Sequence, residues 1–571
     1  MKSSSNRIAL SCLAAVLVLV SACEPGSRNA TTMDTGLPLS EGLQAYDVLR
    51  YTLRNEILVD REAIAGSASV RFAALRDMDT LELDFDGTFH IDSIDGPGGT
   101  LDHEATESKL FIKLGETVPA GETREVTVRY RGKPVVAKRP PWDGGFQWAE
   151  TPSGKPWIAT SFQGEGCDIW WPCKDHPSDE PDGVDLHITV PGDLTVASNG
   201  VLVGVTDEPD GRKTFHWQTN VPTNLYGIAL NIGPYELIEG THTSTNGTEI
   251  PLAFWAIEDH ADDARKLFDT EMNEMVAFFE KFAGPYPWGQ EKLGIAETPH
   301  LGMEHQTINA YGNEFKRDKY GFDWLLHHEL AHEWFGNLVS ASDYADLWIH
   351  EGFGAYMQPV YTQEVMGDAA FHARMYEAYL GIRACNPVAP RGEFSDDRLH
   401  GDEGPGGDIY GRGAWTLHSL RYLMGDEPFW ESVRVLLYDT PDPETLEPPI
   451  AARHRTTDDY LEITSTIAGR DLSWFFEVYF RSTAVPELVA RQEGADVVLE
   501  WKTEDDLPFD MPVPVRRSGE VVRVEFSSNT ARLAGLSIAE VQIDPFMQVL
   551  RKLPSLPTCA EREAEAKKAE S

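Results

Sequence analysis

The sequence is short of basic side chains. Only 49 Lys and Arg stand against 92 Asp and Glu in 571 residues, so the formal net charge is −43. A surface of this sign repels phosphate backbones, which argues against nucleic acid as a partner. The excess charge favours solubility, and it also fits an attraction for cationic substrates such as peptides with a free amino terminus. Charge alone does not choose between these two interpretations.

Long apolar runs are also missing, with one exception close to the first residue. Ile8 to Val20 is apolar and follows the positive charges of Lys2 and Arg7. The run has the length of a signal-peptide core and is too short for a permanent membrane span. We therefore predict a signal peptide over residues 1–22.

The residues that end this segment, Val20-Ser21-Ala22-Cys23, resemble a bacterial lipobox. On this prediction Cys23 becomes the lipidated first residue, and the mature protein is anchored to a membrane without spanning it. Glu24 after the cysteine favours the outer membrane of a Gram-negative cell envelope. The alternative is a plain cleavable signal followed by an incidental cysteine.

Cysteine is scarce, with 6 in the whole sequence, and none has zinc-finger spacing. An exported compartment permits disulfides between the cysteines that remain after Cys23. Four cysteines allow three pairings, so the sequence leaves the pairing open. These four are Cys167, Cys173, Cys385 and Cys559.

The chain is too long for one hydrophobic core, and its patterns indicate an α+β protein of several domains. A linker rich in small and polar residues is predicted over 23–42. Short alternating apolar runs between Gly, Pro and Asp clusters predict an antiparallel β-domain over 43–240. A mainly helical domain over 241–484, a small β-domain over 485–553 and a charged tail over 554–571 follow.

The strongest strand signals of the first β-domain are five apolar or alternating runs: Val59 to Phe72, Leu81 to Phe85, Leu110 to Leu114, Val126 to Tyr130 and Leu186 to Val190. Helical periodicity starts near residue 260. Further helical stretches are predicted at about 322–341, 351–366, 412–424, 457–468 and 473–480.

One short segment, His328-Glu329-Leu330-Ala331-His332, predicts a metal site. Residues i and i+4 lie on one face of a helix, so both imidazoles can bind one ion. Zinc accepts His nitrogen at about 2.0–2.1 Å in a roughly tetrahedral arrangement. The alternative is two surface histidines on an amphipathic helix. Glu351 favours the metal site, because a carboxylate on the following helix can supply a third ligand.

Three protein ligands leave a tetrahedral metal one open position, which is typical of a catalytic zinc site. We therefore predict one zinc ion per chain, held by His328, His332 and Glu351. Glu329 is offset from the ligand face and can reach a water without ligating the metal. We expect Glu329 to take a proton from the attacking water and to deliver it to the leaving amine.

These residues resemble the aminopeptidase N family of gluzincin zinc metallopeptidases, which includes leukotriene hydrolase. The match reads HELAHEWFGN at 328–337 and DLWIHEGF at 346–353. Glu333 and His350 stand where the family usually has Gln and Asn, and neither change removes a ligand. The resemblance spans about residues 45–485 and implies a saddle-like N-terminal β-domain and a thermolysin-like catalytic domain, before the small C-terminal β-domain, expected to be a β-sandwich.

Many family members add a large helical domain that roofs the active site. Only about twenty residues follow the last predicted strand here, so that domain is expected to be absent. We predict a more open cleft as a consequence.

A second match, LGMEH at 301–305, resembles the family's Gly-x-Met-Glu-Asn segment. The resemblance implies that Glu304 binds the free α-amine of the substrate, beside Gly302 and Met303. A carboxylate suits an ammonium group, whereas the alternative for Glu304 is a solvated carboxylate at a strand edge. His305 replaces the family's Asn, which leaves the strictness of terminus recognition open.

Two further matches supply candidate side chains. Tyr410, in YGRGA at 410–414, resembles a family tyrosine and is implied to stabilise the oxyanion, since a phenol donates a hydrogen bond and stays neutral. Gln163, in TSFQGEGCDIWWPCKDHP at 160–177, is implied to help hold the α-amine. The alternatives are a core tyrosine and a solvent-exposed loop glutamine. Asp168 stands near the place of a family Arg.

The sequence thus predicts a zinc-dependent aminopeptidase that removes amino-terminal residues from peptides. We expect a monomer, anchored through its lipid, whose partners are peptides with a free amino terminus and not nucleic acid. Two alternatives stay open. One is a zinc endopeptidase or hydrolase with relaxed terminus recognition, and the other is a non-catalytic binding member of the family.

Overall fold

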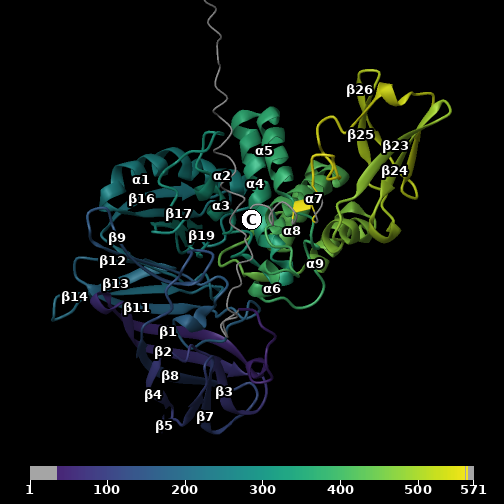
Figure 1. Cartoon of the computed structure of the whole chain (residues 1–571). Helices are drawn as coiled ribbons and strands as arrows, with labels where there is room; N and C mark the ends of the chain where they lie inside the picture. The colour runs from purple at the N-terminus through teal and green to yellow at the C-terminus, as the bar shows by residue number, and fades with distance from the viewer. Residues whose placement is uncertain (1–34, 558, 560, 563–571) are drawn as a thin grey trace, which may run out of the picture.

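The structure is a computed structural model that describes residues 35–557, 559, 561 and 562. The predicted signal peptide and Cys23 lie outside these residues. Figure 1 shows three parts in chain order: a β-rich part, a mainly helical part, and a second β-rich part at the opposite end of the molecule. Within the described ranges, no helix has the length and apolar character needed to span a bilayer.

An eight-stranded sheet dominates the first part, in the order β13-β14-β11-β1-β2-β8-β4-β5. Its inner face packs into a core with two smaller sheets, ordered β12-β15-β10-β9 and β3-β7-β6. The strands are β1 (Tyr46–Leu58), β2 (Ala63–Ala74), β3 (Met78–Asp84), β4 (His90–Gly96), β5 (Gly99–Thr100), β6 (His103–Ala105), β7 (Lys109–Val118), β8 (Thr123–Gly132), β9 (Gly145–Glu150), β10 (Pro156–Ser161), β11 (Val184–Pro191), β12 (Thr195–Ser198), β13 (Val201–Asp207), β14 (Arg212–Thr219) and β15 (Leu230–Gly233).

Two details of the first β-domain differ from prediction. β1 and β11 pair in parallel, so the purely antiparallel sheet was wrong at this position. Alternation reports which face of a strand is buried and carries no information on the direction of its partner. The predicted strand from Val59 also starts later, at Ala63, because Val59–Arg61 forms a helical turn that ends with Glu62 at φ 49°.

The middle part begins with a mixed five-stranded sheet, ordered β16-β17-β18-β20-β19. Its strands are β16 (Tyr235–Thr243), β17 (Glu249–Ile257), β18 (Leu293–Glu297), β19 (Gly302–Met303) and β20 (Ile308–Tyr311). β19 lies at one edge and pairs with β20 alone among the described strands.

Helices form the bulk of this part, with α1 and α2 between β17 and β18 and the others after β20. They are α1 (Ala261–Leu267), α2 (Asn273–Phe282), α3 (Trp324–Ala331), α4 (Trp348–Met366), α5 (Asp368–Gly381), α6 (Asp396–His400), α7 (Asp408–Met424), α8 (Asp426–Tyr438), α9 (Thr457–Ala468) and α10 (Ser473–Phe476). The helix predicted over 322–341 is wrong in its second half. α3 ends at Ala331 with His332 as its C-cap, and β21 (Val339–Ala341) then pairs with β22 (Arg453–Arg455).

The last part consists of two three-stranded antiparallel sheets, ordered β23-β24-β27 and β26-β25-β28. It shares a hydrophobic core with the helices, where Phe509 contacts Trp474 and Tyr479 edge-on. The strands are β23 (Glu487–Glu493), β24 (Asp496–Lys502), β25 (Val513–Arg517), β26 (Glu520–Val524), β27 (Thr530–Leu533) and β28 (Val541–Ile543).

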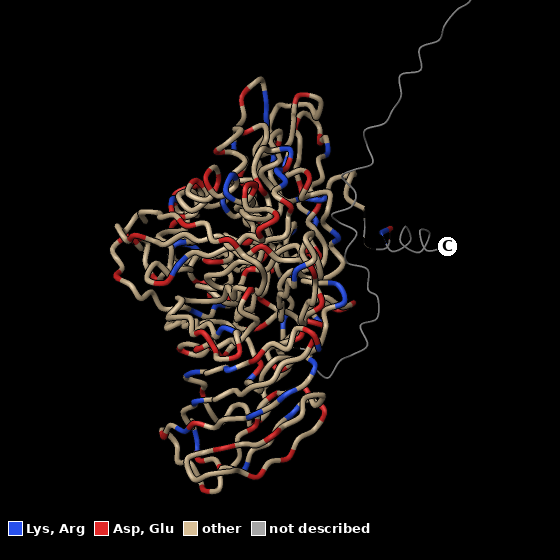
Figure 2. Tube along the Cα trace, turned by 90° about the vertical axis from the view of Figure 1, so that its left-hand side faces the viewer, with Lys and Arg blue, Asp and Glu red and all other residues tan. Residues whose placement is uncertain are grey.

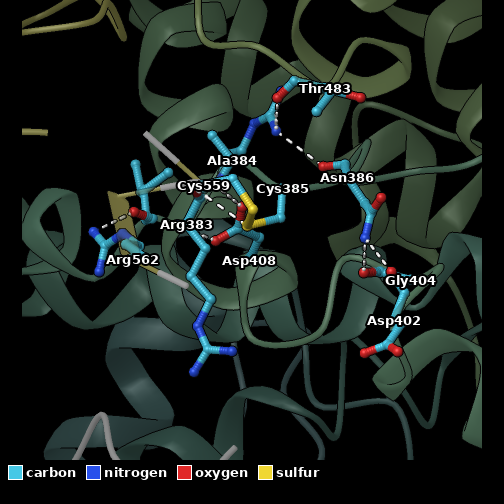
Figure 3. The surroundings of a disulfide bond; sticks show 12 residues. Arg383, Ala384, Cys385, Asn386, Asp402, Gly404, Asp408, Thr483, Cys559 and Arg562 are labelled. Atoms are coloured by element: carbon cyan, nitrogen blue, oxygen red, sulfur yellow. Dashed lines mark hydrogen bonds between the residues drawn. A yellow bond between two sulfur atoms is a disulfide. The ribbon is translucent and has the colours of Figure 1, made fainter. Parts of the chain in front are cut away.

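Two disulfides resolve the pairing that the sequence leaves open. Cys167 bonds to Cys173 within one loop, and Cys385 bonds to Cys559, which is 174 residues later. Figure 3 shows the second bond beside Asp408, whose carboxylate accepts hydrogen bonds from the backbone N–H of Arg383 and Ala384. Cys559 is thereby tied to the loop that contacts the first turn of α7.

Acidic residues are spread over all three parts of the tube in Figure 2, with basic residues between them. This distribution fits the interpretation of the charge as a general contribution to solubility.

Candidate active site

The helix α3 owes its position to Asp323, which precedes its first residue. The Asp323 carboxylate accepts hydrogen bonds from the backbone N–H of Leu325 and Leu326, at 3.0 and 3.1 Å. It also accepts one from the Tyr311 hydroxyl of β20 at 2.5 Å. Asp at an N-cap satisfies backbone donors that have no partner within the helix. The cap therefore fixes the helix with His328 against the five-stranded sheet.

The three predicted ligand residues meet at one point. The Nε2 atoms of His328 and His332 are 3.3 Å apart, and they lie 3.5 and 3.6 Å from Oε2 of Glu351. Ligand atoms bound at about 2.0–2.2 Å to a tetrahedral zinc lie roughly 3.3–3.6 Å from one another. The spacing of the three atoms thus fits a single zinc ion.

Two further observations on His332 and Glu351 fit a metal at this position. Nδ1 of His332 lies 2.8 Å from the Phe335 carbonyl oxygen, so it carries the proton and leaves the Nε2 lone pair free. Oε2 of Glu351 is buried and has no hydrogen-bond partner among the described residues. A buried carboxylate oxygen without a donor is costly unless a cation binds it. This oxygen supports the fit of a metal more directly than the spacing does.

Glycines let α4 pack closely against the two imidazoles and against α7. A Cβ on Gly354 would lie 3.2 Å from Cε1 of His332, and one on Gly413 would lie 3.0 Å from Cα of Gly352. The first contact brings α4 against the imidazoles, and the second brings α4 against α7. Glu351 and Tyr410 are consequently neighbours although they belong to different helices.

Glu329 lies directly under β19. A Cβ on Gly302 would come within 2.4 Å of the Glu329 Oε1, so only glycine leaves space for this carboxylate. Burial, followed by the charges of Glu304 and Glu351, raises the pKa of Glu329 well above its usual range. Burial also raises the pKa of Glu351, to about 7, and lowers that of His328 to about 4. A divalent cation at the three ligand atoms offsets such an excess of buried acid groups.

Glu304 is held by two side chains of the first β-domain. Its Oε1 accepts hydrogen bonds from the Gln163 amide at 3.2 Å and from the Tyr226 hydroxyl at 2.9 Å. Carboxylate oxygens of Glu304 and Glu329 and a ring nitrogen of His332 all lie within 4.8 Å of one another. The structure therefore brings the predicted amine-binding residues next to the predicted metal ligands. Met303, on β19 before Glu304, is buried.

Tyr410 lies in the first turn of α7, and its ring centroid is 6.1 Å from that of His328. Its side chain is 36% exposed, so solvent reaches this side of the site. Burial of the hydroxyl and the charges of Glu351 and Glu304 raise the pKa of Tyr410 well above its usual range. The phenol therefore keeps its proton and can donate it in a hydrogen bond.

Three of the departures from the family pattern lie at buried positions. Glu333 accepts hydrogen bonds from the Thr307 backbone N–H and the Asn309 amide, a role that an amide oxygen also fills. Nε2 of His350 accepts one from the Ala341 backbone N–H at 2.8 Å. His305 is fully buried, and neither ring nitrogen has a partner in the described part of the chain. Its side chain lies in the interior, away from solvent.

Sequence reasoning missed three residues that build this site. Asp323 carries a recognisable signal, because Asp commonly precedes a helix. Asn337 lies in the quoted motif, and its amide donates to the Glu304 carbonyl oxygen at 3.0 Å. Tyr226 has no such signal, since 78 residues separate it from Glu304 and only the fold joins them.

Two family models match the chain, and together they cover more than half of it. Residues 47–226 match the peptidase M1 N-terminal domain, and residues 267–476 match the peptidase family M1 domain. The chain belongs to peptidase family M1. The resemblance to the aminopeptidase N family is thereby confirmed.

Curated relatives of this M1 chain are distant. Leukotriene A-4 hydrolase of Xenopus laevis is 27% identical over 325 residues, which cover 55% of this chain and 51% of the relative. Leucine aminopeptidase 2 of Ajellomyces capsulatus is 24% identical over 388 residues, covering 65% and 58%. The matched region spans about half the length of these relatives.

Solved structures share the fold. An M1 zinc metallopeptidase from Deinococcus radiodurans, solved as a variant bound to a Tyr-Ser-Ala substrate, superposes with a TM-score of 0.63 at 21% identity. The match covers 77% of this chain and 95% of that one. A two-domain M1 zinc metallopeptidase bound to L-tryptophan gives a TM-score of 0.65, also at 21% identity, covering 79% and 96%.

Proposed function

We propose that this M1 protein is a zinc aminopeptidase that removes residues from the free amino terminus of peptides. The observation that carries the proposal is the position of Glu304. Gln163 and Tyr226 hold its carboxylate, and it lies beside Glu329 and the ligand His332. A carboxylate fixed next to the metal site suits an ammonium group one residue before the bond that is cut.

His328, His332 and Glu351 would hold the zinc. When bound, zinc supplies a Lewis acid that polarises the scissile carbonyl and makes an attacking water more acidic. Glu329 then accepts the proton of the water and passes it to the leaving amine. The Tyr410 hydroxyl donates a hydrogen bond to the oxygen on which negative charge develops. The donor role of Tyr410 agrees with the protonated state that its surroundings impose. The base role of Glu329 agrees with its position.

The edge strand β19 supports a peptide as substrate. β19 pairs with β20 on one side, and the structure describes no strand on its other side. An extended peptide can add to such an edge through backbone hydrogen bonds. Gly302 and Met303 would then lie along the first residues of the substrate, with Glu304 at its amino terminus.

Acetylation of a test peptide separates this proposal from an endopeptidase with relaxed terminus recognition. The protein should cut a peptide with a free amino terminus and should not cut its acetylated form, because acetylation removes the charge that Glu304 binds. Product analysis by mass spectrometry reads out both reactions. Equal cleavage of the two forms would establish the endopeptidase instead, and cleavage of neither would favour a binding protein.

We also propose that the chain is a monomer attached to the outer membrane by a lipid on Cys23. Support for the lipid comes from residues 20–23, which lie outside the described part.

Two three-stranded sheets that share a core with the helices support the small C-terminal β-sandwich.

A further inference from the structure

A second cluster of metal-ligand side chains lies on the eight-stranded sheet of the first β-domain. His187 on β11 and His216 on β14 are directly opposite each other in an antiparallel pair. Asp185 lies two residues before His187, so the same face of β11 carries both side chains. In Figure 1 these strands lie in the lower part of the molecule, in a different sheet from β19 and apart from α3 and α4.

The possible ligand atoms of this cluster lie near one another. One nitrogen from each imidazole and one Asp185 oxygen lie within 4.8 Å of one another. Nε2 of His216 is 3.0 Å from Oδ1 of Asp185. The two imidazole rings stack with centroids 4.0 Å apart, so one ring must turn about its side-chain bonds before both can bind one ion. Two nitrogens and one oxygen form the donor set of many zinc sites.

The backbone under the cluster is firmly anchored. β11 alternates strictly between buried and half-buried residues, so Leu186 and Ile188 fix the strand on both sides of His187. Phe215 and Trp217 do the same on both sides of His216. Side chains on two paired strands hold their relative positions better than side chains on a loop. The backbone positions of the three side chains are therefore fixed.

Neighbouring side chains orient the carboxylate. Arg50 donates to Oδ2 of Asp185 at 2.6 Å, and Gln218 donates to Oδ1 at 2.7 Å. Ligating carboxylates in metal sites are themselves hydrogen-bonded in this manner.

The cluster lies on the half-buried face of the sheet, where solvent can reach it. Arg54 on β1 is in register with His187, and its exposed guanidinium can turn into solvent. The side chains of His216 and Asp185 are 27% and 14% exposed, so an ion can reach them.

We propose that Asp185, His187 and His216 bind a second divalent transition-metal ion, separate from the catalytic zinc. Imidazole and carboxylate together suit zinc, copper or nickel, whereas calcium and magnesium prefer six or more oxygen atoms. Water completes the coordination from the exposed side of the sheet.

Zinc stoichiometry tests the proposal. The protein, its His187→Ala variant and its His216→Ala variant are saturated with zinc, desalted and measured by elemental analysis. Each variant should retain one zinc ion fewer per chain than the unmodified protein. His103→Ala is the matched control, because His103 is an exposed strand histidine of the same β-domain. It should retain the full number.

The difference of one ion is the readout, so the result does not depend on how fully the catalytic site is loaded. Equal zinc content in the protein and both variants would overturn the proposal and leave the cluster as a stacked imidazole pair bonded to Asp185. Loss of one ion in the control as well would also overturn it. Circular dichroism and peptidase activity, both expected to be unchanged in His187→Ala, show that the variant is folded.

Discussion

At the scale of single residues, a free amine at this site would meet a carboxylate that is already oriented. Oε1 of Glu304 accepts two hydrogen bonds from the other domain, and its backbone carbonyl accepts one from Asn337. A side chain fixed before the substrate arrives loses little conformational entropy on binding. In the proposed aminopeptidase, recognition of the amino terminus would depend on residues that do not contact the bond to be cut.

Tyr226→Phe should weaken substrate binding. Hydrogen bonds to charged groups contribute about 1.5–3 kcal/mol, so a rise in KM of roughly 10-fold or more is expected for aminoacyl substrates. The turnover number kcat should change less, because Glu304 holds the amine before and during the reaction. Steady-state kinetics measure both constants. Tyr376→Phe, which alters an exposed phenol on α5, is the control, and equal effects in the two variants would contradict this role.

Gly302→Ala should displace the general base. The added Cβ would meet Oε1 of Glu329 at 2.4 Å and Cδ1 of Leu325 at 2.8 Å, so these side chains must shift. A misplaced base should lower kcat by at least about 10²-fold, while the bound zinc is retained. Gly98→Ala is the matched control, since nothing lies within 4 Å of its Cβ position. Full activity of Gly302→Ala would show that Glu329 is not the base.

At the scale of elements, the short helix α3 shows what local pattern can predict. The i, i+4 spacing placed His328 and His332 on one face correctly, because that geometry is a property of the helix itself. The end of the helix was missed, because tertiary contacts decide it. After His332 the chain turns, with Gly336 at φ 143°, and Val339 joins Arg453 in a strand pair more than a hundred residues apart in sequence.

Asp323→Ala should destabilise this element. The loss of an N-cap costs about 0.5–2 kcal/mol in the free energy of unfolding, and the Tyr311 hydroxyl also loses its acceptor. Denaturant unfolding measures the change. Asp323→Asn keeps an oxygen at the cap and should lose less stability. If Asn were as harmful as Ala, the cap would not explain the position of α3.

At the scale of the whole molecule, the order of the three parts can be predicted from the periodicity of the sequence. The contacts that join distant segments cannot. Changes between a strand period and a helix period mark the parts along the chain. The disulfide between Cys385 and Cys559, the parallel pairing of β1 with β11, and the contact of Tyr226 with Glu304 each join distant segments. Such contacts depend on packing in three dimensions, which the period of a single segment does not encode.

The proposed reaction depends most on Glu329 as the base beside a bound zinc. Glu329→Gln keeps the size of the side chain and its packing under Gly302 but cannot accept a proton. Its rate on a panel of aminoacyl substrates, with the zinc content of both proteins measured, tests the claim directly. We expect a rate at least about 10²-fold below that of the unmodified protein, with equal zinc content. An unchanged rate at equal zinc content would contradict it.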